Sequence, residues 1–226
     1  KKLSMSKRNI IVLNHKNCFS KHKQIINLFS EFKKRLSNLK AKKFLVAISG
    51  GPDSLALAAM CKAYEISSKK KFFYIHIDHG IRKESSRESK QVQKILKEQD
   101  ITIKIVQNRK KIKNNIQKNA RNIRYELLDN ECKKRKIKYI LTAHHKDDQV
   151  ETFLIRLSRG SGVQGLSAMS IATPLNKRIT ILRPLLNVLA AKPLTSPVIP
   201  PPIANKQSCL EKFLFSKILF IASIVV

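Results

Sequence analysis

The sequence contains little of several residue types that mark particular classes of protein. It has no tryptophan, four cysteines and only 15 acidic residues among its 226 residues. The cysteines are scattered singly, without a C-x-x-C pair or a histidine at metal-ligand spacing. We therefore expect no zinc site, no iron-sulfur cluster and no disulfide framework, and we interpret the cysteines as reduced thiols of a cytoplasmic protein.

Long apolar runs are also missing. The basic start of the chain contains an apolar stretch that is too short for a signal peptide. The run FLFSKILFIASIVV, which begins at Phe213, is shorter than the roughly 20 residues that a spanning helix requires. We expect no membrane partner, and we interpret this run as a docking segment or an aberrant terminus, with a membrane anchor as the less favoured alternative.

The scarcity of acids leaves a strongly basic chain. Against the 15 acids stand 46 lysines and arginines, which gives a formal net charge of +31. Such an excess suits a polyanionic partner, of which RNA or DNA is the first candidate. The alternative is a coding bias toward lysine, with the side chains simply solvated.

Periodicity predicts an α/β protein. Short apolar runs that begin at Phe44, Phe72, Ile101 and Lys138 are typical of buried parallel strands, and helical patterns separate them. An amphipathic helix within 25–39 precedes the first strand. We predict a doubly wound, mostly parallel sheet with helices on both faces. The expected organisation is a basic segment and helix over 1–40, the main domain over 41–187, and a proline-rich linker with an apolar tail over 188–226.

The segment SGGPDS follows the first predicted strand and resembles an anion cradle. A glycine pair lets backbone N–H groups curl around a phosphate, and the next helix adds its positive N-terminus. It is neither a Walker A loop nor a G-x-G-x-x-G motif. An acid in such a loop is explained if it binds Mg²⁺ that accompanies the phosphates. The alternative is an ordinary strand-to-helix turn. The residues concerned are Ser49, Gly50, Gly51, Pro52, Asp53 and Ser54.

Further polar clusters follow the other strands, where ligands bind in open α/β sheets. In DHGIR, Asp78 and His79 could contact a nucleotide or a metal and Arg82 a phosphate; a solvated turn is the alternative. Arg121 and Arg124 lie three residues apart on a predicted helix and could contact phosphate or RNA, or be solvated.

The segment HHKDDQVET concentrates acids that the chain otherwise avoids. Asp147 and Glu151 are helical neighbours, and His144 and His145 could transfer protons or cap the strand end. Val150, Leu154 and Leu157 form an apolar stripe, which predicts that this helix buries one side and directs carboxylates into a cleft. The negative charge could hold Mg²⁺ through Asp147, together with Asp53, or receive an ammonium group.

SGGPDS resembles the signature of the PP-loop ATP pyrophosphatases. DHGIRKESSRE, NARNIRYELL, LTAHHKDDQVETFLIRLSRGSGVQGLSAM and RPLL resemble, in order, the motifs of the tRNA(Ile)-lysidine synthetase family. The resemblance covers about residues 20 to 187. It implies an adenine nucleotide alpha hydrolase-like fold that uses ATP and Mg²⁺ and acts on a tRNA.

The implied reaction joins free lysine to C2 of the wobble cytidine in the CAU anticodon of tRNA(Ile), through an adenylated cytidine. By this resemblance residues 49–54, 78 and 79 bind ATP, residues 82, 121 and 124 contact tRNA or phosphate, and the catalytic set is Asp53, Arg121, Arg124, His144, Asp147 and Glu151.

The resemblance ends at Asn187, beyond which five prolines fall between Pro193 and Pro202. The family continues differently there, so we expect a C-terminally truncated or altered member. Three hypotheses follow: a working lysidine synthetase, a catalytically silent nucleotide- or RNA-binding remnant, and another PP-loop tRNA enzyme such as a thiolase. The absence of paired cysteines disfavours the thiolase.

Overall fold

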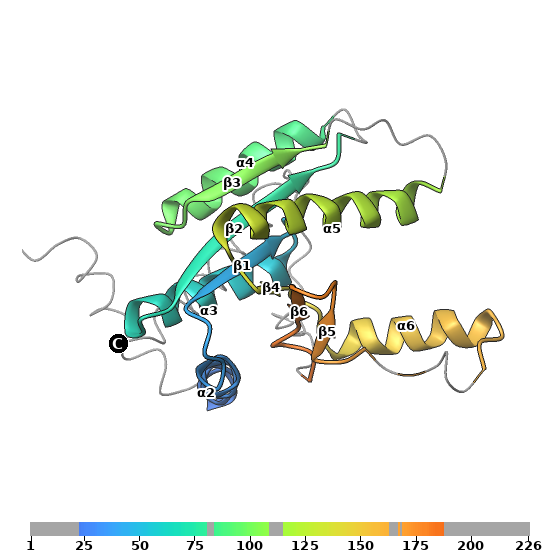
Figure 1. The fold of residues 1–226 in the computed structure, drawn as a ribbon, viewed down its shortest axis with the longest axis horizontal. Helices are drawn as coiled ribbons and strands as arrows, with labels where there is room; N and C mark the ends of the chain where they lie inside the picture. Colours follow the sequence, from blue (N-terminus) through green and yellow to red (C-terminus); the bar gives the residue numbers. More distant parts are fainter. Residues whose placement is uncertain (1–22, 81–83, 109–114, 163–166, 168, 188–226) are drawn as a thin grey trace, which may run out of the picture.

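A computed structural model describes residues 23–80, 84–108, 115–162, 167 and 169–187 of the chain. Within these ranges the structure is one twisted sheet with helices packed on it (Figure 1). Arg82, the expected tail over 188–226 and most of the N-terminal basic segment lie outside the described residues.

The sheet has six strands in the order β3-β2-β1-β4-β6-β5. All neighbouring strands are parallel except β5 and β6, which pair antiparallel. The four predicted strands are confirmed, whereas β5 and β6 were not predicted. The strands are β1 (Lys43–Ile48), β2 (Lys71–Asp78), β3 (Ile103–Gln107), β4 (Tyr139–Leu141), β5 (Ala172–Pro174) and β6 (Thr180–Leu182).

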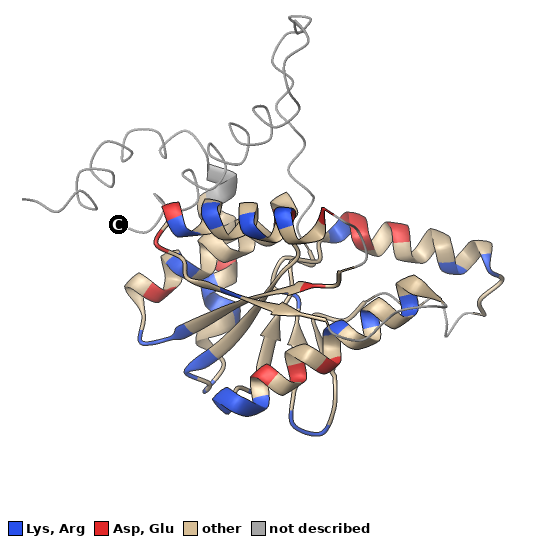
Figure 2. Ribbon diagram, turned by 90° about the horizontal axis from the view of Figure 1, so that it is seen from above, with Lys and Arg blue, Asp and Glu red and all other residues tan. Residues whose placement is uncertain are grey.

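Helices cover both faces of this sheet, which confirms the doubly wound architecture (Figures 1 and 2). Side chains alternate across a strand, so Phe44, Val46 and Ile48 of β1 enter one core while Leu45 enters the other. The first core is closed by α2 (Lys23–Ser37), α3 (Pro52–Ser67) and α4 (Ser85–Glu98), and the second by α5 (Ile116–Arg135).

The predicted amphipathic helix near the N-terminus is α2. Phe29, Phe32 and Leu36 are all nearly fully buried, and the ring of Phe32 meets Tyr64 of α3 edge-on at 6.2 Å between centroids. Arg35 Nη1 also donates a hydrogen bond of 2.8 Å to the carbonyl of Pro184. This helix is thereby attached to α3 and to the segment that follows β6.

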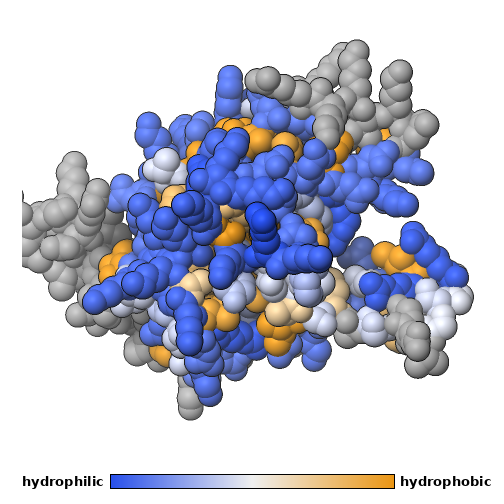
Figure 3. Space-filling model, in the orientation of Figure 1, coloured by the Kyte–Doolittle hydropathy of each residue, from blue (hydrophilic) through white to orange (hydrophobic). Residues whose placement is uncertain are grey.

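The helix α6 (Lys146–Ser158) does not pack as predicted. None of its residues is buried; Val150, Leu154 and Leu157 of the expected stripe are 51%, 56% and 51% exposed. The prediction that this helix buries one side was therefore wrong for the described residues. Figure 1 shows α6 extending away from the sheet, and apolar residues are visible on this projection in Figure 3. Only its first turn lies near the sheet, because just four residues separate it from the end of β4.

Parallel strands place their carboxyl ends at one edge of the sheet. Here the ends of β1, β2 and β4 all open there, each followed by a helix N-terminus or a polar turn. Among the helices of the described residues, none is long and apolar enough to cross a membrane.

Candidate active site

A cavity of about 400 Å³ lies at the carboxyl ends of β1, β2 and β4. It brings together segments that are up to 101 positions apart in the chain, from Ala47 to Asp148. Of the predicted site residues, those that line it are Ser49, Gly51, Asp53, Ser54, Asp78, His79, Arg121, Arg124 and His144. Gly50, Pro52, Asp147 and Glu151 are described but do not line it.

The loop 49–54 curls tightly between β1 and α3. Gly50 has φ +93°, a conformation that side chains rarely adopt, and it donates its N–H to Ser54 Oγ at 3.2 Å. Ser54 Oγ in turn donates to the carbonyl of Gly51 at 2.8 Å. Gly51 is the N-cap of α3, and Pro52 occupies the first turn, where its missing N–H costs nothing. The loop thus presents a helix N-terminus to the cavity, as an anion site requires.

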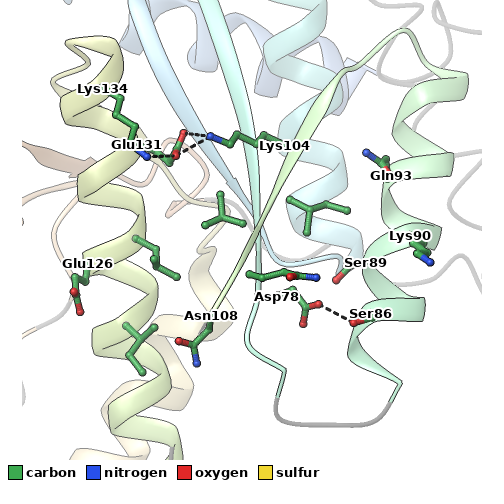
Figure 4. A pocket seen from close by; sticks show the side chains of 15 residues that line it. Asp78, Ser86, Ser89, Lys90, Gln93, Lys104, Asn108, Glu126, Glu131 and Lys134 are labelled. Carbon is green, nitrogen blue, oxygen red and sulfur yellow. Dashed lines mark hydrogen bonds and ion pairs between the residues drawn. The ribbon is translucent and has the colours of Figure 1, made fainter. Parts of the chain in front are cut away.

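Asp78 ends β2 and is 4% exposed. Its carboxylate accepts hydrogen bonds from Gly80 N–H at 3.0 Å and from Ser86 Oγ at 3.2 Å (Figure 4). Burial by itself raises the pKa of Asp78, but these hydrogen bonds outweigh it, so that the pKa is lowered and the group is ionised. An ionised acid at the end of β2 is therefore connected to Gly80 and to Ser86 in the first turn of α4.

Arg121 and Arg124 approach the cavity from α5, on one face of the helix as their spacing predicts. Arg124 Nε donates to His79 Nε2 at 3.4 Å, and the guanidinium of Arg121 lies 5.2 Å from the ring centre of Tyr125. Burial lowers the pKa of His79, and the charge of Arg124 lowers it further. His79 is therefore a neutral ring beside two cationic side chains.

The segment after β4 brings an acid and two histidines to the cavity. His144 Nδ1 lies 2.9 Å from Thr142 Oγ1. Burial lowers the pKa of His144, and the nearby charge of Arg183 adds to this effect. His144 is thus neutral near pH 7 and can accept a proton.

The acid that reaches the cavity from α6 is Asp148, not Asp147. Its Oδ2 accepts the N–H of His145 at 2.8 Å, which caps the first turn of α6. His145 Nε2 lies 3.6 Å from Oδ2 of Asp148 and 3.6 Å from Oδ2 of Asp53, so the two carboxylates converge on one point. Asp147 and Glu151 are exposed.

His145, which the sequence indicated as a candidate for proton transfer, also lines the cavity. Sequence reasoning missed three other contributors to this region. His76 and Thr142 line the cavity, and Arg183 is buried beside it, with Nη1 donating to Ser170 O and Thr173 Oγ1 at 2.8 Å each. Arg183 stands in the RPLL motif, which was noticed without a role for its arginine. The alternation of β2 offered a signal for His76, since it shares a strand face with Asp78.

A second cavity of about 670 Å³ adjoins the first (Figure 4). It runs along the edge strand β3 between α4 and α5, and it shares Asp78 and Ser89 with the first cavity. At its far end the buried carboxylate of Glu131 accepts hydrogen bonds from Lys104 at 2.9 and 3.0 Å. This ion pair joins β3 to α5.

The cavity offers too few protein ligands to hold Mg²⁺ by itself, but enough to hold Mg²⁺ that is also bound by the phosphates of a ligand. Across the described residues there is no group of three or more histidine, cysteine or acidic side chains that could hold a metal. Mg²⁺ bound together with phosphates needs only one or two protein carboxylates. Asp53 and Asp148 supply two, with side chains 48% and 33% exposed.

Curated proteins with similar sequences are tRNA(Ile)-lysidine synthases. Over 145 residues the chain is 46% identical to tRNA(Ile)-lysidine synthase of Wolbachia pipientis wMel. This alignment covers 63% of this chain and 33% of that protein. It is 38% identical over 166 residues to tRNA(Ile)-lysidine synthase of Bradyrhizobium diazoefficiens, covering 72% of this chain and 46% of that protein. The chain thus spans a third to a half of the length of these curated relatives.

Among solved structures, the U34-tRNA thiolase NcsA from Methanococcus maripaludis superposes with a TM-score of 0.60, over 92% of this chain and 78% of that one. At 20% identity this likeness concerns the fold alone. A family model for the PP-loop domain matches residues 23–193, which include every strand and helix described above. The chain therefore belongs to the PP-loop domain family.

Proposed function

We propose that this protein ligates lysine to C2 of the wobble cytidine in the CAU anticodon of tRNA(Ile), at the expense of ATP. In this reaction the C2 oxygen attacks the α-phosphate of ATP and releases pyrophosphate. The lysine amine then attacks C2, and AMP leaves with that oxygen. The observation that carries the proposal is the convergence of loop 49–54, the end of β2, α5 and the start of α6 on one cavity, in a chain similar to tRNA(Ile)-lysidine synthases.

The loop would bind the triphosphate of ATP. The loop and the first turn of α3 line the cavity, and Gly51 leaves open space beside it, since an added Cβ would meet nothing nearer than Ser49 Oγ at 3.7 Å. Asp53 and Asp148 would hold Mg²⁺, which when bound neutralises phosphate charge. Asp53 keeps the role of magnesium ligand that the sequence predicts. As the second ligand we propose Asp148 in place of Asp147, because Asp148 lines the cavity and Asp147 does not.

His144 would take the proton that lysine must lose. A protonated amine has no lone pair to attack C2, so a neutral base within the cavity favours this step. The lowered pKa of His144 suits it, because the imidazole is then unprotonated at neutral pH. The exposed Glu151 remains a possible contact for a substrate that reaches beyond the cavity.

Arg121 and Arg124 would contact the tRNA or the phosphates. A guanidinium matches phosphate oxygens in a planar, two-pronged geometry. Lysine and arginine are spread over helices on both faces of the sheet (Figure 2), so the whole surface favours approach of a polyanion. Because its proposed substrate is a tRNA, we also propose that the protein acts in the cytoplasm.

The test is ATP-dependent incorporation of labelled lysine into an isoleucine tRNA transcript with a CAU anticodon. We expect incorporation by the wild type, none by Asp53→Ala, and unchanged incorporation by Glu98→Ala, which removes an exposed acid at the end of α4. A transcript with a GAU anticodon should take up no lysine. Equal incorporation by wild type and Asp53→Ala would refute the assignment, and a folded wild type without incorporation would favour the silent remnant.

A further inference from the structure

A buried histidine beneath the loop 49–54 connects three elements. His76 of β2 is 8% exposed, and its side chain lies on the face of β2 that packs on α4. Its Nδ1 lies 2.9 Å from the carbonyl oxygen of Ile48, the last residue of β1, and its Nε2 lies 3.0 Å from Ser89 Oγ of α4. One imidazole ring thus joins the ends of two strands to a helix.

The chemistry of the partners determines how this ring is used. A carbonyl oxygen only accepts, so Nδ1 must carry a hydrogen and donate it to Ile48. Ser89 Oγ also lies 2.8 Å from the carbonyl of Ser85, one turn earlier in α4. The ring therefore holds the carbonyl that immediately precedes Ser49 and connects it to the first turn of α4.

A second contact between α4 and the loop lies close by. A Cβ added at Gly50 would meet Cγ2 of Val92, one turn beyond Ser89, at 3.0 Å. The helix α4 consequently supports the loop at two points, through His76 at its start and through Val92 at Gly50. Asp78 and Ser86 tie the start of the same helix to the end of β2 (Figure 4).

We propose that His76 is a positioning residue that holds loop 49–54 in the conformation that binds the triphosphate of ATP. This inference rests on the proposed function, because it assumes that the loop binds ATP. His76 acts through the Ile48 carbonyl and through α4, and it requires no contact of its own with the nucleotide. Loss of the ring nitrogens would free the turn at Ser49 while leaving the apolar core in place.

The experiment compares ATP affinity, by equilibrium binding, among four variants of the full chain. His76→Phe keeps a ring and removes both hydrogen bonds, so we expect the Kd for ATP to rise about ten-fold or more. His76→Asn retains an N–H near the place of Nδ1 and should restore most of the affinity. Ser89→Ala removes only the connection to α4 and should give an intermediate Kd.

Glu131→Gln is the matched control for general destabilisation. Glu131 is buried to a similar degree, 3% exposed, but its partners Lys104 and Arg135 lie away from the loop. We expect it to lower thermal stability and to leave the Kd for ATP within about two-fold of wild type. In turnover assays His76→Phe should raise the KM for ATP and leave the KM for lysine unchanged.

The outcomes separate the two proposals. If the folded wild type does not bind ATP, the proposed function falls and this inference falls with it. If the wild type binds ATP and His76→Phe binds it equally well, or if Glu131→Gln weakens binding as much, only the role of His76 is refuted. Should His76→Phe fail to fold, a Kd for Ser89→Ala equal to that of wild type would refute it.

Discussion

Gly50 and Gly51 are adjacent in the sequence, yet the structure predicts opposite tolerance to a side chain. Gly50 has φ +93°, and an added Cβ would meet Val92 Cγ2 at 3.0 Å. Gly51 has φ −74° and open space, with Ser49 Oγ at 3.7 Å. The matched substitutions Gly50→Ala and Gly51→Ala therefore add the same methyl group to two different backbone environments.

The expected cost at Gly50 has two parts. An alanine in the left-handed region costs about 1–2 kcal/mol, and overpacking against Val92 adds about 1–3 kcal/mol. Gly51→Ala loses a favourable N-cap residue, a cost of about 1 kcal/mol or less. We expect the free energy of unfolding to fall by about 2–5 kcal/mol for Gly50→Ala and by clearly less for Gly51→Ala.

Urea denaturation of both variants measures these differences. The steric part is isolated by introducing Gly50→Ala into a Val92→Ala background, where only the cost of the positive φ, about 1–2 kcal/mol, should remain. ATP binding should weaken more for Gly50→Ala than for Gly51→Ala. The reasoning is refuted if Gly50→Ala unfolds within about 0.5 kcal/mol of wild type, or if the cost is the same in both backgrounds.

Three further results are expected. Burial lowers the pKa of His144 in the folded state, so as the pH falls below about 6.5 the unfolded chain binds a proton at this histidine before the folded protein does. The free energy of unfolding should therefore fall below that pH. His144→Gln should reduce this loss, measured as the difference in thermal stability between pH 7.5 and 5.5. Asp148→Ala should speed hydrogen exchange in the first turn of α6, where Asp148 accepts the N–H of His145, whereas Asp147→Ala should not; equal exchange would contradict the cap. Leu154→Ser on exposed α6 should change the free energy of unfolding by about 0.5 kcal/mol or less. Leu57→Ala in the core should lower it by about 2–5 kcal/mol. A similar loss in both variants would contradict the exposure of α6.

Much of the fold follows from local pattern. The strands β1 and β2 are continuous apolar runs, as expected of strands that are covered on both faces, and the loop 49–54 carries its glycines and proline where the backbone requires them. The strands β5 and β6 contain three residues each and are defined by pairing, β6 with the distant β4 and β5 with β6. Pairing of this kind is a tertiary contact that the local pattern does not contain.

The apolar positions of α6 show the limit of periodicity. Their spacing is that of an amphipathic helix, which is correct, but periodicity carries no information about whether a neighbouring element covers the apolar face. In the described part of the chain none does. The same helix explains why Asp148 and not Asp147 reaches the cavity, because a rotation of one residue directs a side chain about 100° away.

The sequence by itself determined the α/β class, the phosphate-type loop and the identity of most residues that meet at the cavity, since these depend on local periodicity and on residue chemistry. Only the tertiary structure decided that Asp53 and Asp148 converge on His145, that Gly50 abuts Val92 and that His76 connects β1 to α4. Those contacts join residues far apart in the chain. They depend on the register of the strands and the rotation of each helix, which packing of the whole core sets.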